Sequence, residues 1–400
     1  MSQQATHTNS TANNMGVLIS TALMFLVFQS TVSVLPIYVI DQYKATTSEV
    51  GLMLTVFAMA ALSSRPLGGP LMHKLGEKRA YIGALVLFAI ASALIGTANS
   101  MGALLAFRAI QGFALGVSTS AGGTLIASNS SSENMNMAMA QFAMAINLPL
   151  VVGPYLGNLV VQHYGYPLYF GICVVTGVLS ALVGLTTHVA HNPVPAAAAP
   201  KDPTTPEEAS SVLDRFIERS AVPVAMNVLI IGICNSAILA FATVYAKEIG
   251  LLPLAGFFFG VHALMFSFSR PLFGWFFNRI GETATLYLGI VLIIAGFLVM
   301  GLLHTSISYL GSAGILGVGY GILFPTFQSL IMRMAPAGRT GFANSTFFLF
   351  MDSGVTLGSF TMGMVAERAG LSGMYILAAA VSTAMFVLFT RARRAPGYPA

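Results

Sequence analysis

The sequence predicts an all-α membrane protein with twelve transmembrane helices in two six-helix, pseudo-symmetric halves. Of its 400 residues, 56% are hydrophobic and 8% are charged, whereas about a quarter of the residues are charged in a typical soluble domain. Apolar runs recur along the whole chain at about the 20 residues that a helix needs to cross a bilayer. Finally, the stretch SRPL at 64–67 returns at 269–272, exactly 205 residues later, which points to an internal duplication.

The expected helices follow from the apolar runs. None of these runs alternates polar and apolar residues as the strands of a membrane barrel do, so each is expected to be helical. The runs lie near 16–40, 50–72, 80–98, 102–126, 135–161, 167–188, 221–246, 254–277, 284–304, 306–332, 341–365 and 371–390.

A linker divides these runs six and six. Residues 189–220 are first rich in Pro and Ala and then acidic, a composition typical of a flexible linker. We therefore expect an N-terminal half at 1–188 and a C-terminal half at 221–400. The interval of 205 residues also aligns glycines without a gap, among them Gly112 with Gly317 and Gly116 with Gly321. Transporters built from two parallel repeats bind substrate near the bilayer midplane, between the repeats.

The positive charge is a signal of topology. The formal net charge is +5, but the Lys and Arg residues gather in alternate loops, and the opposite loops hold only Lys44, Lys247 and Arg368. Such a bias places the basic loops in the cytoplasm. We expect a multi-pass protein of the cell (inner or plasma) membrane with both termini cytoplasmic, and no nucleic-acid partner.

Four stretches resemble the major facilitator superfamily, and within it the twelve-helix drug:proton antiporter branch. They are RPLGGPLMHKLGEKR at 65–79, LLAFRAIQGFALG at 104–116, PLVVGPYLG at 149–157 and RTGFANSTFFLFMDSGVTLG at 339–358. The first resembles the family's loop between its second and third helices, and the third resembles its antiporter Gly-Pro motif. The resemblance implies the major facilitator fold, efflux of small molecules including multiple drugs, and alternating access.

The resemblance also implies which residues take part in gating. The family's loop motif usually has an acid where this chain has His73, and the second copy has Asn278. The Arg-Pro pairs are expected to end or kink their helices, either as a structural corner or as a gate hinge. The gating residues are expected to be Arg65, Pro66, Gly69, His73, Gly76, Arg79, Gly153, Pro154, Gly157, Arg270, Pro271 and Gly274.

Three ionisable residues inside the apolar runs are the candidates for proton coupling. Asp352 lies about eleven residues, roughly 16 Å, into its run, where a carboxylate binds a proton, faces a cation or serves as a structural hydrogen-bonding group. Arg108 tunes proton release in the family, or is a fixed ion bound to carbonyls and Gln111. His262 relays protons or is a neutral, hydrogen-bonded residue.

Polar and aromatic side chains within the runs are the candidates for substrate binding. Asn147 is the repeat counterpart of Asp352, and Gln29 and Asn235 occupy neighbouring repeat positions. The set is Gln29, Tyr38, Gln111, Asn147, Asn235, Gln328 and Asn344.

The function predicted from these features is proton-coupled export, by antiport, of a small amphiphilic, cationic or zwitterionic molecule. The alternative is a proton-coupled importer or facilitator of a sugar or organic acid, which predicts more embedded acids in the first half or paired Arg residues. An enzyme is excluded because the loops are short and carry no P-loop, zinc pattern or nucleophile elbow. The expected partners are a small-molecule substrate, protons and the lipid bilayer; we expect no cofactor, no metal and a monomer.

Overall fold

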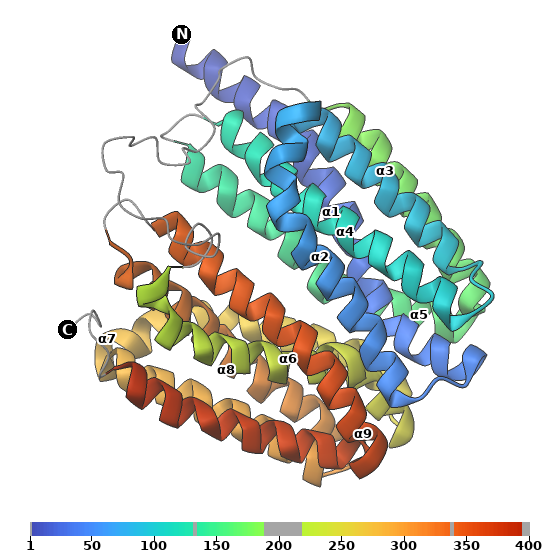
Figure 1. Ribbon diagram of the computed structural model, residues 1–400, viewed down its shortest axis with the longest axis vertical. Coiled ribbons are helices and arrows are strands. Elements are labelled where there is room, and N and C mark those ends of the chain that lie inside the picture. Colours follow the sequence, from blue (N-terminus) through green and yellow to red (C-terminus); the bar gives the residue numbers. More distant parts are fainter. Residues whose placement is uncertain (1, 131–133, 188–217, 337–339, 394–400) are drawn as a thin grey trace. The chain divides into compact units, whose positions relative to one another are not determined.

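The computed structural model describes residues 2–130, 134–187, 218–336 and 340–393 (Figure 1). Over these ranges the structure holds no strand, so the predicted all-α class is confirmed. Two 3₁₀ turns, η2 (Arg219–Ala221) and η3 (Leu252–Leu254), precede α6 and α7. The helices are α1 (Ser2–Tyr43), α2 (Thr47–Leu75), α3 (Glu77–Ile95), α4 (Met101–Ser128), α5 (Met135–Leu185), α6 (Val222–Glu248), α7 (Ala255–Leu302), α8 (Ser306–Met334) and α9 (Thr340–Ala392).

Three helices change direction at a glycine. Gly165 in α5, Gly281 in α7 and Gly370 in α9 have φ of 80°, 79° and 74° with ψ near 170°, a conformation that is open essentially to glycine alone. Each lies between two predicted apolar runs. In the described ranges ten helical segments are long and apolar enough to cross a membrane, and the two of them that reach 49 and 50 residues contain Gly165 and Gly370. The count of twelve spans stays a prediction.

The first Arg-Pro pair is predicted to end or kink its helix. A helix end there is wrong, because α2 continues to Leu75, nine residues beyond Pro66, and a kink stays a prediction. The helix of α7 likewise continues through Pro271. A proline inside a helix removes one backbone hydrogen bond, which neighbouring groups in a membrane bundle can compensate. The side chains of Arg65, Pro66, Gly69, Arg270, Pro271 and Gly274 lie outside the described part of the structure.

The chain forms two compact units. Unit 1 comprises the described residues of 1–45 and 56–197, and unit 2 those of 46–55 and 198–400. In unit 1, α1 packs on α5, and α3 on α4 and α5; in unit 2, α6 packs on α9, and α7 on α8 and α9. The predicted halves stay a prediction, and residues 188–217, most of the predicted linker, lie outside the described residues.

Residues that are 205 positions apart in the sequence also make equivalent contacts in the structure. A Cβ at Gly112 would lie 2.2 Å from the carbonyl oxygen of Phe57, and one at Gly317 would lie 2.4 Å from that of His262, which is residue 57 plus 205. The next pair behaves alike: a Cβ at Gly116 or Gly321 would lie 1.9 or 1.8 Å from the hydroxyl of Ser64 or Ser269. Each unit therefore brings two helix backbones into contact at equivalent glycines.

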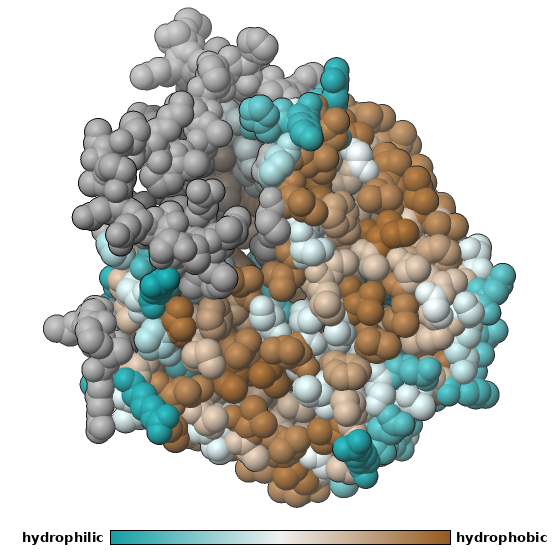
Figure 2. Space-filling view, in the orientation of Figure 1, coloured by the Kyte–Doolittle hydropathy of each residue, from teal (hydrophilic) through white to brown (hydrophobic). Residues whose placement is uncertain are grey.

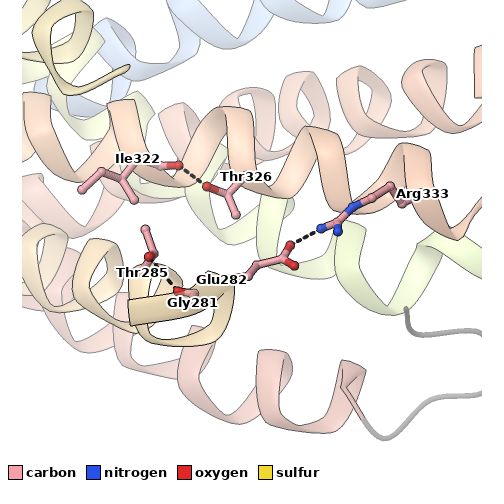
Figure 3. Close-up of polar contacts among 6 residues, drawn as sticks. All are labelled: Gly281, Glu282, Thr285, Ile322, Thr326 and Arg333. Carbon is pink, nitrogen blue, oxygen red and sulfur yellow. Dashed lines mark hydrogen bonds and ion pairs between the residues drawn. The ribbon is translucent and has the colours of Figure 1, made fainter. Parts of the chain in front are cut away.

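A polar contact at the start of α3 is also repeated. Ser128 Oγ donates to Glu77 Oε2 at 3.2 Å in unit 1. The equivalent residues of unit 2 are Arg333 and Glu282, which form an ion pair (Figure 3). Figure 3 also shows Gly281, the glycine of the turn, whose carbonyl oxygen accepts a hydrogen bond from Thr285. The two contacts therefore occupy equivalent positions in the two repeats, but one is a hydrogen bond from a hydroxyl and the other is an ion pair.

Large apolar side chains are exposed on many helices and cover much of the visible surface (Figure 2). Along α5 the side chains of Leu148, Val175 and Leu182 are more than half exposed. A soluble monomer rarely exposes apolar patches of such extent. This surface agrees with helices that face lipid.

Replacement of Gly112 by Ala is expected to destabilise the protein by about 1–3 kcal/mol, because the new methyl group would overlap the carbonyl oxygen of Phe57. The midpoint of thermal unfolding of the purified protein in detergent measures this effect. Gly83→Ala in α3 is the matched control, since a Cβ there has no neighbour within 4 Å. Equal midpoints for the two variants would contradict the close backbone contact.

Candidate functional site

Arg108 lies buried in α4 of unit 1 and takes part in a short polar network. Its side chain is 1% exposed, and Nη1 donates to Gln111 Oε1 at 2.5 Å. Gln111 Nε2 in turn donates to Ser92 Oγ at 2.8 Å. The guanidinium carbon lies 4.3 Å from the centre of the Phe57 ring, a distance at which a cation is attracted to the ring face.

The charge of Arg108 is not neutralised by an acid among the residues that the structure describes. Nε has no hydrogen-bond partner there. The guanidinium is held by an amide oxygen and an aromatic ring. The predicted contact of Arg108 with Gln111 is present, and it commits the polar groups of Gln111 to this network.

The predicted Gly-Pro stretch packs α5 closely against α1. A Cβ at Gly153 would lie 3.0 Å from Gln29 Cβ, and one at Gly157 would lie 3.0 Å from Ser30 Cβ. Pro154 is buried, and its carbonyl oxygen accepts a hydrogen bond of 2.8 Å from Asn158 Nδ2. Gln29 is 9% exposed, so its side chain has little surface that a substrate could contact in this structure.

Tyr38 belongs to an aromatic cluster in unit 1. Its ring centroid lies 4.9 Å from those of Tyr166 and Phe170 and 6.0 Å from that of Tyr43, all in edge-to-face geometry. Tyr166 donates a hydrogen bond of 3.1 Å to Asp41. Tyr38 is 8% exposed, which makes it a packing residue of the end of α1 in this structure.

Four other predicted residues of unit 1 are at its surface. Asn147 is exposed and donates to the carbonyl oxygen of Ala143 in its own helix at 2.8 Å. His73, Gly76 and Arg79 are exposed at the junction of α2 and α3, where Gly76 has φ of 82°. The structure does not bring these four together with Gln29, Tyr38 or Arg108.

In unit 2 the structure brings two predicted binding residues into contact. Gln328 Nε2 of α8 donates to Asn344 Oδ1 of α9 at 2.9 Å. Asp352 lies eight residues, about 12 Å, further along α9, and Asn344, Phe348 and Asp352 share one helix face at a spacing of four residues. All three are partly exposed, so this face carries an amide, an aromatic ring and a carboxyl group.

His262 of α7 is buried in an aromatic setting. Phe258 lies parallel to its ring with the centroids 6.4 Å apart, and the Tyr320 ring of α8 lies 5.9 Å away. His262 Nδ1 and Tyr320 Oη both lack a hydrogen-bond partner among the described residues. Tyr320 is not among the residues predicted from the sequence, because nothing in an apolar run distinguishes one tyrosine that faces a polar group from the others. Asn235 of α6 is partly exposed.

Comparison with known proteins decides the family. The model of the Major Facilitator Superfamily matches residues 17–359. The chain belongs to the Major Facilitator Superfamily. As a member it is a multi-pass membrane transporter of small molecules, and it is not an enzyme.

Individual relatives have low sequence identity to this chain. The uncharacterized MFS-type transporter MJ1560 of Methanocaldococcus jannaschii is 23% identical over 347 residues, 86% of this chain and 89% of that protein. The multidrug export protein EmrB of Escherichia coli (strain K12) is 29% identical over 174 residues, 43% of this chain and 34% of that protein. The crystal structure of the nucleoside transporter NupG superposes with a TM-score of 0.74 at 16% identity, over 94% of this chain and 99% of that one. The last comparison supports the major facilitator fold alone.

Replacement of Ser92 by Ala is expected to destabilise the protein by about 1–3 kcal/mol, because the buried Nε2 of Gln111 loses its acceptor. Thermal unfolding of the purified protein measures the effect. Ser63→Ala is the control, since Ser63 is exposed and its hydroxyl donates only within its own helix. If Ser92→Ala melts at the same temperature as Ser63→Ala, the Arg108 network does not stabilise unit 1.

Proposed function

We propose that this transporter exports a small amphiphilic, cationic or zwitterionic molecule in exchange for protons, by alternating access, across the cell membrane. Asp352 carries this proposal: it places a carboxyl group on a partly exposed face of an apolar helix that also bears Asn344 and Phe348. A carboxylate within a membrane-spanning helix is costly unless it binds a proton or faces a cation. Asp352 is therefore the proposed proton carrier, with Arg108 and His262 as the other candidate coupling groups.

The direction of transport is inferred from two features. The multidrug export protein EmrB is similar to 43% of this chain, and that relative is an exporter. In addition, the Gly153-Pro154 stretch resembles the Gly-Pro motif that is typical of antiporters in the family. Both resemblances favour an exporter that works by alternating access.

The charged residues within the predicted spans limit which net charges the substrate can carry. Within the predicted spans Asp352 is the one deeply placed acid and Arg108 the one deeply placed base. A single carboxyl group does not match a multiply charged cation. Inward movement of one proton supplies about 1.4 kcal/mol per pH unit, and the membrane potential adds roughly 2.3 kcal/mol per 100 mV for each net charge moved. Exchange of one proton for a neutral or zwitterionic compound uses both terms, whereas exchange for a monocation moves no net charge and uses the pH term alone.

Everted membrane vesicles from cells that overproduce the protein test this proposal. The vesicles are energised so that their lumen becomes acidic, a pH-sensitive dye reports the gradient, and cationic, zwitterionic and neutral compounds are added in turn. We expect at least one compound to dissipate the gradient with the wild-type protein and to lose this effect with Asp352→Asn, because the amide cannot carry a proton.

Glu49→Gln is the matched control for Asp352→Asn. It removes one carboxylate at the exposed start of α2, where Glu49 accepts a hydrogen bond from the Thr46 backbone at 2.8 Å, and it should respond as the wild type does. If Asp352→Asn also responds as the wild type does, Asp352 is structural. If labelled sugar or organic acid crosses while no compound moves protons, the alternative of an importer or facilitator replaces the antiporter.

The proposed topology, with both termini in the cytoplasm, predicts which loops face the medium. Lys44 and Lys74 are exposed at opposite ends of α2, and the two native cysteines are buried. A membrane-impermeant thiol reagent should label Lys44→Cys in intact cells and Lys74→Cys only after permeabilisation. The reverse pattern would invert the topology.

A further inference from the structure

His262 differs in its surroundings from its repeat counterpart, Phe57. Phe57 of unit 1 and His262 of unit 2 are equivalent positions, and the backbone of each touches the equivalent glycine of the facing helix. In unit 1 the Arg108 guanidinium lies over the Phe57 ring at 4.3 Å. The residue equivalent to Arg108 is Ala313, which supplies no positive charge to the aromatic rings around His262.

Two polar atoms near this position lack a partner within the described chain. His262 is 9% exposed and Tyr320 is 3% exposed, and neither His262 Nδ1 nor Tyr320 Oη has a hydrogen-bond partner. Their ring centroids are 5.9 Å apart, with the ring planes at 67°. Buried polar groups in folded proteins are nearly always hydrogen-bonded, so a pair of unpartnered atoms on facing helices points to a ligand group between them.

The hydrogen-bonding state of the ring identifies the kind of ligand group. A neutral imidazole carries its hydrogen on one ring nitrogen and a lone pair on the other. In the tautomer with the hydrogen on Nε2, the unpartnered Nδ1 of His262 is an acceptor. The phenolic oxygen of Tyr320 also has lone pairs to offer.

The surroundings favour a positive charge. The Phe258 ring lies parallel to that of His262, and the Tyr309 ring lies 4.7 Å from that of Phe258. The faces of these rings carry partial negative charge and attract cations. Two acceptors within an aromatic wall suit a group that is cationic and donates more than one hydrogen bond.

We propose that an ammonium group of the transported molecule binds between His262 Nδ1 and Tyr320 Oη, beside the ring of Phe258 that lies parallel to that of His262. In unit 2 the substrate supplies the positive charge that Arg108 supplies over Phe57 in unit 1. This inference rests on the proposed function and narrows its substrate class to primary or secondary amines with an apolar body. His262 is then a substrate ligand, and the proton is left to Asp352.

Equilibrium binding of three matched probes tests the site. Isothermal titration of the full-length protein in lipid nanodiscs compares 2-phenylethylammonium, its N,N,N-trimethyl analogue, which donates no hydrogen bond, and neutral 2-phenylethanol. We expect 2-phenylethylammonium to bind most tightly. His262→Phe, which introduces the residue of the equivalent position in unit 1, and Tyr320→Phe, which removes only the hydroxyl, should each weaken its binding about tenfold, the effect of one lost hydrogen bond to a charged group.

Tyr375→Phe is the matched control, because Tyr375 is buried in the same unit and its hydroxyl donates to the carbonyl oxygen of Ala237 at 3.3 Å. It should bind the ammonium probe as the wild type does. The proposal is overturned if the wild type does not bind 2-phenylethylammonium, if the three probes bind alike, or if His262→Phe and Tyr320→Phe bind as tightly as Tyr375→Phe. No proton gradient enters this measurement, so failure of antiport in vesicles and failure of amine binding are separate results.

Discussion

Contact between helix backbones, which glycine alone permits, is the constraint on which each unit depends. Lipid tails are as apolar as the helix surfaces, so helices in a membrane associate through close packing and interhelical hydrogen bonds and not through hydrophobic burial. The glycines at 112 and 116, and at 317 and 321, let two helices meet at their carbonyl groups and serine hydroxyls. This contact also positions side chains one turn away: Arg108, four residues before Gly112, lies over the ring of Phe57 on the facing helix.

The two units share this frame and differ in what it holds. At the first glycine contact, unit 1 holds an aromatic ring beneath a guanidinium, and unit 2 holds an imidazole beside a phenol. The two units thus have equivalent backbone contacts and different polar groups. Unit 1 carries the guanidinium of Arg108, and unit 2 carries Asp352 and two buried polar atoms that lack a hydrogen-bond partner among the described residues.

Much of the fold could be predicted from the sequence. Hydropathy indicates which segments lie in the membrane, and glycine indicates where the backbone can bend or approach a neighbouring helix. The apolar runs predicted helices, and the bends that the structure shows at Gly165, Gly281 and Gly370 fall between predicted runs. Pro66 was misleading, since a proline removes one hydrogen bond without dictating that a helix end there. The site was harder to predict, because a helix that is apolar on every side gives no sign of its rotation. The contact of Arg108 with Gln111 follows from their spacing of three residues, but the contact of Gln328 with Asn344 and the role of Tyr320 depend on how separate helices are turned.

The repeated turn before α3 has a consequence for the response of each unit to salt. Its contact in unit 1 joins a hydroxyl to a carboxylate, and its counterpart in unit 2 joins two full charges, with the Arg333 side chain 43% exposed. Counter-ions at physiological strength screen exposed charge pairs over about 8 Å and weaken them further as the concentration rises. A hydroxyl donor has no net charge to screen. The two equivalent contacts therefore differ in their sensitivity to ionic strength: the ion pair between α7 and α8 weakens in concentrated salt, whereas the hydroxyl–carboxylate contact between α3 and α4 is less affected.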